Sequence, residues 1–427
     1  MQLAPYRQVL ALRGVWSLLA VSMLARIPVL AGSMVLTLYV VLQLKLGFGA
    51  AGTVFSVSIL GSAIGAPVLG RLTDRYGLRP VVALGTVTSA LFWATAGSMS
   101  FPVLLVAGFV SSLIQVPVFT VSRQALAALV PEAQRRPAYS LDSVAVELSY
   151  MTGPSLGVLV VTQLSPQVAI WAVGVGVTLT GIGLYWLNPP LISESEQATP
   201  AVARPPLRQW LRPGLLAVLL AVAGSTVVLG ATDVVVVAVL REVGELGWAS
   251  VVLPVWGLYS MTGGLVYGGL RRAPGPLPLM LLLGVTTIPL AFAGNWFWLC
   301  VALLPAGLMC APTLAAAADA VSRMAPPVVR GEAMGYYGSS LNIGMAVGAP
   351  LAGVVIDLFG PSWGFAVAGA AGVAIALLAY ALRARDRHRA VDERVPGAVP
   401  VGAEEQPVPV AGEAVAGGVA ALAPAGQ

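Results

Sequence analysis

The sequence predicts an all-α membrane protein with twelve transmembrane helices in two pseudo-symmetric six-helix bundles. Its 427 residues are 58% hydrophobic and only 10% charged, whereas about 25% of the residues in an ordinary soluble domain are charged. Charge-free stretches such as 103–121 and 364–382 are long enough, at 1.5 Å per residue, to cross about 30 Å of hydrocarbon. An internal repeat, described below, predicts the two bundles.

Apolar runs between charged or Pro/Gly-rich breaks predict twelve helices, at 15–44, 50–70, 80–98, 102–128, 139–163, 167–187, 214–240, 248–270, 276–293, 297–321, 333–357 and 362–383. They divide the chain into an N-terminal bundle (1–187) and a C-terminal bundle (214–385). The cytoplasmic linker between them (188–213) is rich in Pro, Ser and Glu, and we expect it to be flexible. The tail (386–427) has too few large apolar residues to fold, so we expect a disordered cytoplasmic segment.

The arginines predict the orientation in the membrane. Apart from Arg26 and Arg241, every arginine, Arg123 included, falls on one side when the N-terminus is placed inside. Only Lys45 and Arg241 remain for the outer loops, so the positive-inside rule puts both termini in the cytoplasm. The net charge of +5 then reflects attraction to the anionic lipid bilayer and gives no reason to expect nucleic acid as a partner. The single lysine and the excess of Ala, Gly and Val favour a bacterial chain, hence a multi-pass protein of the cytoplasmic (inner) membrane, expected to be a monomer.

Two shifts of the chain against itself reveal the repeat. A shift of about 198 residues aligns GAPVLGRL (65–72) with GGLVYGGL (263–270). A shift of about 196 residues aligns Gly153-Pro154 with Ala349-Pro350 and Gly157 with Gly353. A nearly constant offset over several helices favours duplication over chance. Parallel repeats of this kind build a central solute site in certain transporters.

A conspicuous motif separates the second and third predicted helices: Gly70-Arg71-Leu72-Thr73-Asp74-Arg75-Tyr76-Gly77-Leu78-Arg79-Pro80. Gly70 removes a side chain where two helices can approach closely, and Gly77 permits a tight reversal. Asp74 is an anion in a basic loop and can lie against the positive N-terminus of another helix.

This motif resembles the loop signature of the major facilitator superfamily. Gly70, Leu72, Asp74, Arg75 and Gly77 match it, Arg79 stands for its second basic position, and Leu78 departs from it. The resemblance covers residues 10–385 and implies the superfamily fold, secondary transport, and a conformational latch made by Asp74, Arg75 and Arg79. The alternative is a solvated loop whose charges only set the topology. The equivalent loop of the second half, 268–272, has no acid, so a latch there is expected to be degraded.

A second segment suggests a subfamily. Gly153-Pro154-Ser155-Leu156-Gly157 resembles a partial antiporter motif of bacterial drug/proton efflux permeases, with Ser149 in place of the upstream glycine. The alternative is a packing kink, since a Gly-Pro pair is tolerated in any membrane helix. The arginine that many proton-coupled relatives carry on the fourth helix is missing from 107–112.

Charges within the hydrocarbon are the main site candidates, because an unpaired arginine there costs at least about 2.5 kcal/mol. Arg26 and Glu147 lie at similar depth in helices one and five, so we expect a pair that is either a coupling site or a permanent structural salt bridge. Asp142 is expected to satisfy the N-terminus of its own helix. Asp233 is a second protonatable group or a rim residue. Weaker candidates for the cavity wall, each equally able to pack between helices, are Gln115, Trp256, Tyr259 and Asn342.

Missing residue types exclude several functions. The only histidine, His388, lies in the tail, and no GxxxxGK[ST] sequence is present, so we expect no histidine triad or zinc site, no nucleotide binding and no enzyme activity. We expect no cofactor and no metal, with a proton gradient as the energy source. The function predicted best is proton-coupled efflux of a small hydrophobic or amphiphilic substrate by alternating access. Import of a nutrient or metabolite, and a non-transporting sensor or scaffold, stay open as alternatives.

Overall fold

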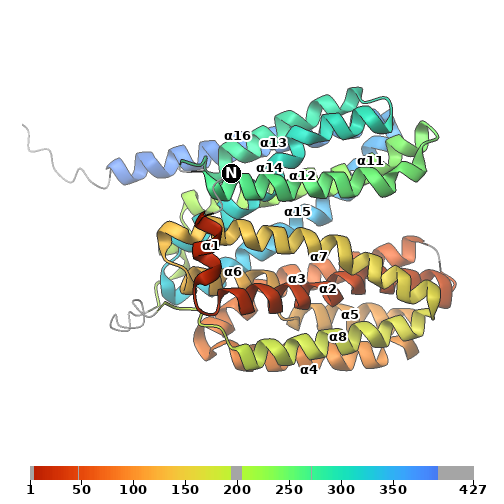
Figure 1. Cartoon of the computed structure of the whole chain (residues 1–427), viewed down its shortest axis with the longest axis horizontal. Coiled ribbons are helices and arrows are strands. Elements are labelled where there is room, and N and C mark those ends of the chain that lie inside the picture. Colours follow the sequence, from red (N-terminus) through yellow and green to blue (C-terminus); the bar gives the residue numbers. More distant parts are fainter. Residues whose placement is uncertain (1–3, 47, 194–203, 271, 393–427) are drawn as a thin grey trace, which may run out of the picture. The chain divides into compact units, whose positions relative to one another are not determined.

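The structure is a computed structural model that describes residues 4–46, 48–193, 204–270 and 272–392. Every regular element in these ranges is a helix. Residues up to Asp386 form one compact unit, in which long helices lie side by side (Figure 1).

Six membrane helices come from the first half of the chain. They are α2 (Val15–Leu38), continued by a π-helical turn (Tyr39–Gln43), α3 (Phe48–Tyr76), α4 (Leu78–Thr95), the α5 and α6 pair (Phe101–Ile114 and Val118–Leu129), α7 (Arg135–Gln163) and α8 (Pro166–Leu187). A short helix that the sequence did not predict, α1 (Ala4–Ala11), precedes them and lies across the ends of the long helices (Figure 1).

The second half supplies six more. They are α11 (Pro213–Glu242), α12 (Ala249–Gly269), α13 (Pro276–Thr287) with a 3-10 turn (Ile288–Phe292), α14 (Trp296–Met324), α15 (Arg330–Phe359) and α16 (Pro361–Asp392). In the described residues, 11 helices are long and apolar enough to cross a membrane, and Pro276–Phe292 is a shorter apolar one. The prediction of twelve transmembrane helices is therefore confirmed.

Two predicted boundaries differ from the structure for local reasons. The second helix continues six residues beyond the predicted end, so the motif residues up to Tyr76 lie on α3 and only Gly77 makes the turn, with a φ of 81° that favours glycine. The fourth helix is broken before Pro117, because proline lacks an N–H donor and disfavours helical geometry at the preceding residue.

The same packing pattern occurs in both halves. Within the halves, α2 packs along α7 and α11 packs along α15; between them, α3 contacts α15 and α12 contacts α7. This is the arrangement that a duplicated sequence predicts, although the limits of the two bundles, 1–187 and 214–385, stay predictions.

Large apolar side chains cover the outer faces of the helices, among them Leu84, Leu91, Val106, Leu179 and Leu377. Soluble proteins rarely expose so much contiguous apolar surface, whereas a bilayer requires it. The chain is a multi-pass membrane protein.

We call the end of the unit that carries Arg75, Arg136, Arg323 and Arg330 the arginine-rich end. The predicted linker begins and ends there and contains a one-turn helix, α10 (Leu207–Trp210). Its central residues, 194–203, lie outside the described residues. The predicted tail, 386–427, begins inside α16, which is helical up to Asp392, and its residues from 393 onward lie outside the described residues.

Candidate functional site

At the arginine-rich end, Asp74 joins the two halves of the chain. Its two carboxylate oxygens accept hydrogen bonds from the backbone N–H groups of Gly331 and Glu332, each at 2.9 Å. These residues open α15, and a carboxylate at a helix N-terminus is stabilised by the unpaired N–H groups and the helix dipole. Glu332 is in turn paired with Arg204, just outside the second bundle. The acid of the motif therefore lies on the start of a helix from the other half.

Glycines allow this contact. A Cβ atom at Gly70 would lie 2.2 Å from the carbonyl oxygen of Gly331, and one at Gly335 would lie 2.4 Å from that of Ala66. Real Cβ atoms essentially never come this close to backbone atoms. The backbones of α3 and α15 touch here because neither helix carries a side chain at these positions.

The other motif residues stay within the first half. The guanidinium of Arg75 lies 5.1 Å from the ring centre of Tyr76, and that of Arg79 lies 5.6 Å from the ring centre of Tyr185. Leu72 lies half-buried on α3. Of the three residues for which the family resemblance implies a latch, only Asp74 forms hydrogen bonds with described residues of the second half.

The second interface, between α7 and α12, uses the opposite charge. Arg136 donates from Nη1 to the carbonyl oxygen of Leu270 at 2.7 Å, at the C-terminus of α12, where helix carbonyls attract cations. Next to it, the Tyr6 hydroxyl of α1 donates to the carbonyl oxygen of Leu265. The loop 268–272 has no residue equivalent to Asp74, as the sequence showed. Here Arg136, a cation on the facing helix α7, makes the contact between the halves.

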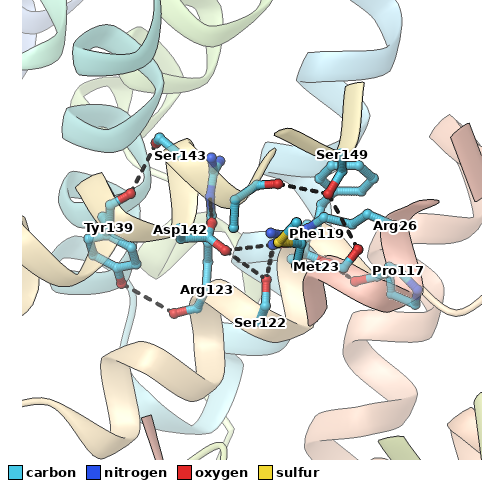
Figure 2. Close-up of polar contacts among 12 residues, drawn as sticks. Met23, Arg26, Pro117, Phe119, Ser122, Arg123, Tyr139, Asp142, Ser143 and Ser149 are labelled. Carbon is cyan, nitrogen blue, oxygen red and sulfur yellow. Dashed lines mark hydrogen bonds and ion pairs between the residues drawn. The ribbon is translucent and has the colours of Figure 1, made fainter. Parts of the chain in front are cut away.

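A buried ion network lies deeper, between α2, α6 and α7 (Figure 2). Asp142 accepts from Nη2 of Arg26 at 2.6 Å and from Nε of Arg123 at 3.0 Å. Ser122 also bonds to Arg26. Arg26 and Asp142 are fully buried and Arg123 is 3% exposed.

This network corrects three expectations. Arg26 pairs with Asp142, and the predicted pair with Glu147 is wrong. Asp142 binds two arginines, where the sequence predicted that it satisfies its own helix terminus. Arg123 lies buried in the fourth span, where the sequence placed it at the cytoplasmic surface. The first error has a geometric cause: Asp142 and Glu147 are five residues apart, so their side chains leave α7 about 140° apart, and a depth estimate ignores this difference.

Arg123 carries the network into the second half. Its Nη1 bonds to the hydroxyl of Tyr337 on α15, and its guanidinium lies 5.1 Å from the ring centre. The Tyr337 hydroxyl donates to the carbonyl oxygen of Leu314 at 3.2 Å. Among the described residues, two nitrogens of Arg26, Nε and Nη1, have no hydrogen-bond partner. The Arg26 guanidinium lies 5.0 Å from the ring centre of Phe119, close enough for a cation–π contact.

Glu147 belongs to a different group of residues, contributed by both halves. Its Oε1 accepts a hydrogen bond from Ser260 of α12 at 2.5 Å. Asp233 of α11 interacts electrostatically with it, and both carboxylates interact with Tyr150 and with Cys310 of α14. Asp233 and Tyr150 are exposed. We call Glu147 and Asp233 the carboxylate pair.

The remaining cavity candidates are divided between separate places. Trp256 is buried on α12, next to Gly257, where an added Cβ would lie 3.9 Å from a carboxylate oxygen of Glu147. Tyr259 packs against Gly307. Asn342 donates to the Ser62 hydroxyl at 3.0 Å, across the interface of α3 and α15. Gln115 instead lines a small cavity of about 20 Å³ within the first half.

The glycines of the second motif pack against α2. A Cβ atom at Gly153 would lie 2.8 Å from the carbonyl oxygen of Ile27, and one at Gly157 would lie 3.2 Å from that of Ala31. Pro154 lies inside α7. This geometry favours the packing interpretation that the sequence left open.

The chain is thus built from two contacting sets of membrane helices, and comparison with known proteins agrees with this architecture. The sequence model described as Major Facilitator Superfamily matches residues 18–286 and 271–415. The first match alone spans more than half of the chain. The chain belongs to the major facilitator superfamily and is a transporter of that family.

Individual relatives are more distant. A chloramphenicol resistance protein of Streptomyces lividans is 27% identical over 358 residues, which cover 77% of this chain and 86% of that protein. A bacterial homologue of the iron transporter ferroportin, solved in an outward-facing state, is 17% identical to this chain, with a TM-score of 0.69. The match covers 88% of this chain and 100% of that protein. The human organic anion transporter MFSD10 is 18% identical with the same coverage and a TM-score of 0.66. At these identities the two structures show the fold alone.

Proposed function

We propose that the chain is a proton-coupled exporter of a small hydrophobic or amphiphilic compound. It works by alternating access, as a monomer in a bacterial cytoplasmic membrane. The arginine-rich end is cytoplasmic in this proposal, because basic residues are retained on that side. The chloramphenicol resistance protein supports the direction of transport and suggests a phenicol-sized neutral amphiphile as the first compound to test.

The carboxylate pair is the observation that carries the proposal. Glu147 comes from the first half and accepts a hydrogen bond from Ser260 of the second half, Asp233 comes from the second half, and none of the ion pairs in the described residues involves either carboxylate. Ionised carboxylates without a cation are costly in a membrane interior and mark proton or solute pathways. Binding a proton removes this cost, so the pair can couple proton entry to the rearrangement of the halves.

The contacts at the arginine-rich end support a state closed to the cytoplasm. Asp74 on the start of α15 and Arg136 on the end of α12 hold the halves together there. Opening the transporter to the cytoplasm must break both contacts, so we assign them the role of latches. Asp74 contributes the acid, with Gly70 and Gly335 providing the close approach.

Everted membrane vesicles test export directly. Respiration acidifies their lumen, so a proton-coupled exporter takes up chloramphenicol or an active compound from a phenicol-like library, and a protonophore abolishes the uptake. Glu147→Gln and Asp233→Asn should each abolish the proton-dependent uptake while the protein still folds. Asp357→Asn, at an exposed site near the end of α15, is the matched control and should transport normally.

Two results would contradict the proposal. One is uptake by right-side-out vesicles with an outside-acid gradient, which would indicate import. The other is proton-dependent uptake by Glu147→Gln equal to that of the unchanged protein, which would remove Glu147 from the coupling site.

A further inference from the structure

Ser260 of α12 forms a hydrogen bond with Glu147 across the interface between the halves. It is 1% exposed, and its hydroxyl donates to Glu147 Oε1 at 2.5 Å. One turn away on α12, an added Cβ at Gly257 would lie 3.7 Å from the sulfur of Met151 on α7. The hydrogen bond therefore lies inside the packed interface between α7 and α12, where it links the two halves.

The surroundings of Glu147 leave this hydrogen bond without competition from a cation. The charged or titratable groups that interact with Glu147 are Asp233 from α11, Tyr150 from α7 itself and Cys310 from α14. The two arginines of the ion network, Arg26 and Arg123, are bound to Asp142. In the described part of the chain, Ser260 supplies the one hydrogen bond recorded for this carboxylate.

The other interface has a similar bond without a titratable group. Between α3 and α15, Asn342 donates to Ser62 at 3.0 Å, and Ser339 donates to the carbonyl oxygen of Ala63 at 2.5 Å. These bonds do not change with the protonation of either partner. Compared with the bonds of Asn342 and Ser339, the hydrogen bond of Ser260 differs because its acceptor is a carboxyl group, whose charge changes with pH.

We propose that Ser260 is a positioning residue that couples the charge of Glu147 to closure of the arginine-rich end. A charged carboxylate accepts a hydrogen bond roughly twice as strongly as a neutral one. Deprotonated Glu147 thus holds α12 against α7, and protonation loosens the contact and lets the halves separate. This inference rests on the proposed proton coupling and adds the residue of the second half that senses it.

The test measures closure as a function of pH. Ala133 and Met324 are exposed at the arginine-rich end, on the first and second half respectively. Spin labels at Ala133→Cys and Met324→Cys, in a Cys300→Ala background that keeps the buried Cys310, report the distance between the halves in lipid nanodiscs. The closed fraction should rise with pH, with a closed-to-open ratio that changes roughly tenfold between the protonated and charged forms of Glu147.

Three variants isolate the role of Ser260. Ser260→Ala should reduce the pH dependence of closure to the part that the Asp74 carboxylate contributes at the same end. It should also shift the midpoint of the transport pH profile by roughly one unit to higher pH, since the lost bond favoured the charged carboxylate. Ser260→Thr keeps a hydroxyl and should restore both properties. Ser62→Ala removes the comparable bond of the other interface and should lower the closed fraction equally at all pH values, with an unchanged midpoint.

The outcomes separate this inference from the proposed function. If Ser260→Ala keeps the original pH dependence, or Ser62→Ala loses it to the same extent, the assignment to Ser260 is wrong while proton coupling through Glu147 can still hold. If the unchanged protein shows neither pH-dependent closure nor proton-dependent transport, both are overturned.

Discussion

Arg26 on α2 and Asp142 on α7 form a fully buried ion pair of 2.6 Å. Asp142 also binds Arg123, so one carboxylate serves two guanidinium groups and the network carries a net positive charge. A buried ion pair adds little net stability, but removing one of its members is strongly destabilising because it leaves an uncompensated buried charge. The network therefore makes a sharp prediction about folding.

We expect Asp142→Asn to destabilise the protein by about 3 kcal/mol. The change keeps the size of the side chain but leaves two buried arginines without an anion, in a segment where unpaired charge is expensive. Thermal unfolding of the purified protein in detergent, followed by intrinsic fluorescence, measures the effect.

Asp357→Asn is the matched control, since it makes the same chemical change at an exposed position of α15. Its unfolding temperature should equal that of the unchanged protein. Equal unfolding temperatures for both variants would mean that Asp142 does not compensate the two arginines.

The pattern of helices was predictable, whereas the pairing of charges was not. Apolar runs report the bilayer thickness directly, so all twelve spans were found. The partner of a buried charge depends on which side of each helix faces which neighbour. Asp142 and Glu147 share a helix and a similar depth, yet only Asp142 faces Arg26. The position of a residue along its helix gives its depth in the membrane but not the direction in which its side chain points.

Arg123 shows the same limit in another form. An arginine close to the end of a span looks like a topology signal, and its compensation by Asp142 requires α6 and α7 to pack side by side. The break before Pro117, which is readable from the sequence, was the available sign that the fourth span is irregular. Asp74 was easier to interpret, because an acid beside a close-packing glycine needs only a helix N-terminus, and α15 supplies one.

We expect Asp74→Asn to open the arginine-rich end. Asparagine keeps one acceptor oxygen but loses the charge, and with it a helix-terminus interaction and a charge-assisted hydrogen bond worth about 1–2 kcal/mol together. The open fraction in the Ala133/Met324 distance measurement should increase by roughly tenfold. Asp357→Asn again serves as the control, and an unchanged distance distribution in Asp74→Asn would deny Asp74 the role of a latch.

We expect Gly335→Ala to reduce transport severely. Its new methyl group would lie 2.4 Å from the carbonyl oxygen of Ala66, so α3 and α15 must move apart and the contact of Asp74 with α15 is lengthened. Gly353→Ala adds the same group to the same helix with nothing within 4 Å. Vesicle transport should be lost in the first variant and retained in the second; equal activities would show that close approach of these helices is dispensable.

The contact of α1 with α12 predicts a pH-independent contribution to closure. Burial raises the pKa of Tyr6 to about 12, so its hydroxyl remains a donor to Leu265 throughout the pH range in which Glu147 would titrate. Tyr6→Phe keeps the ring and removes a neutral hydrogen bond of about 1 kcal/mol. The open fraction should therefore increase by roughly fivefold at every pH, measured by the same distance. Tyr76→Phe, at a position 54% exposed, is the control and should leave the open fraction unchanged. If the effect of Tyr6→Phe depended on pH, α1 would act through the carboxylate pair and not independently of it.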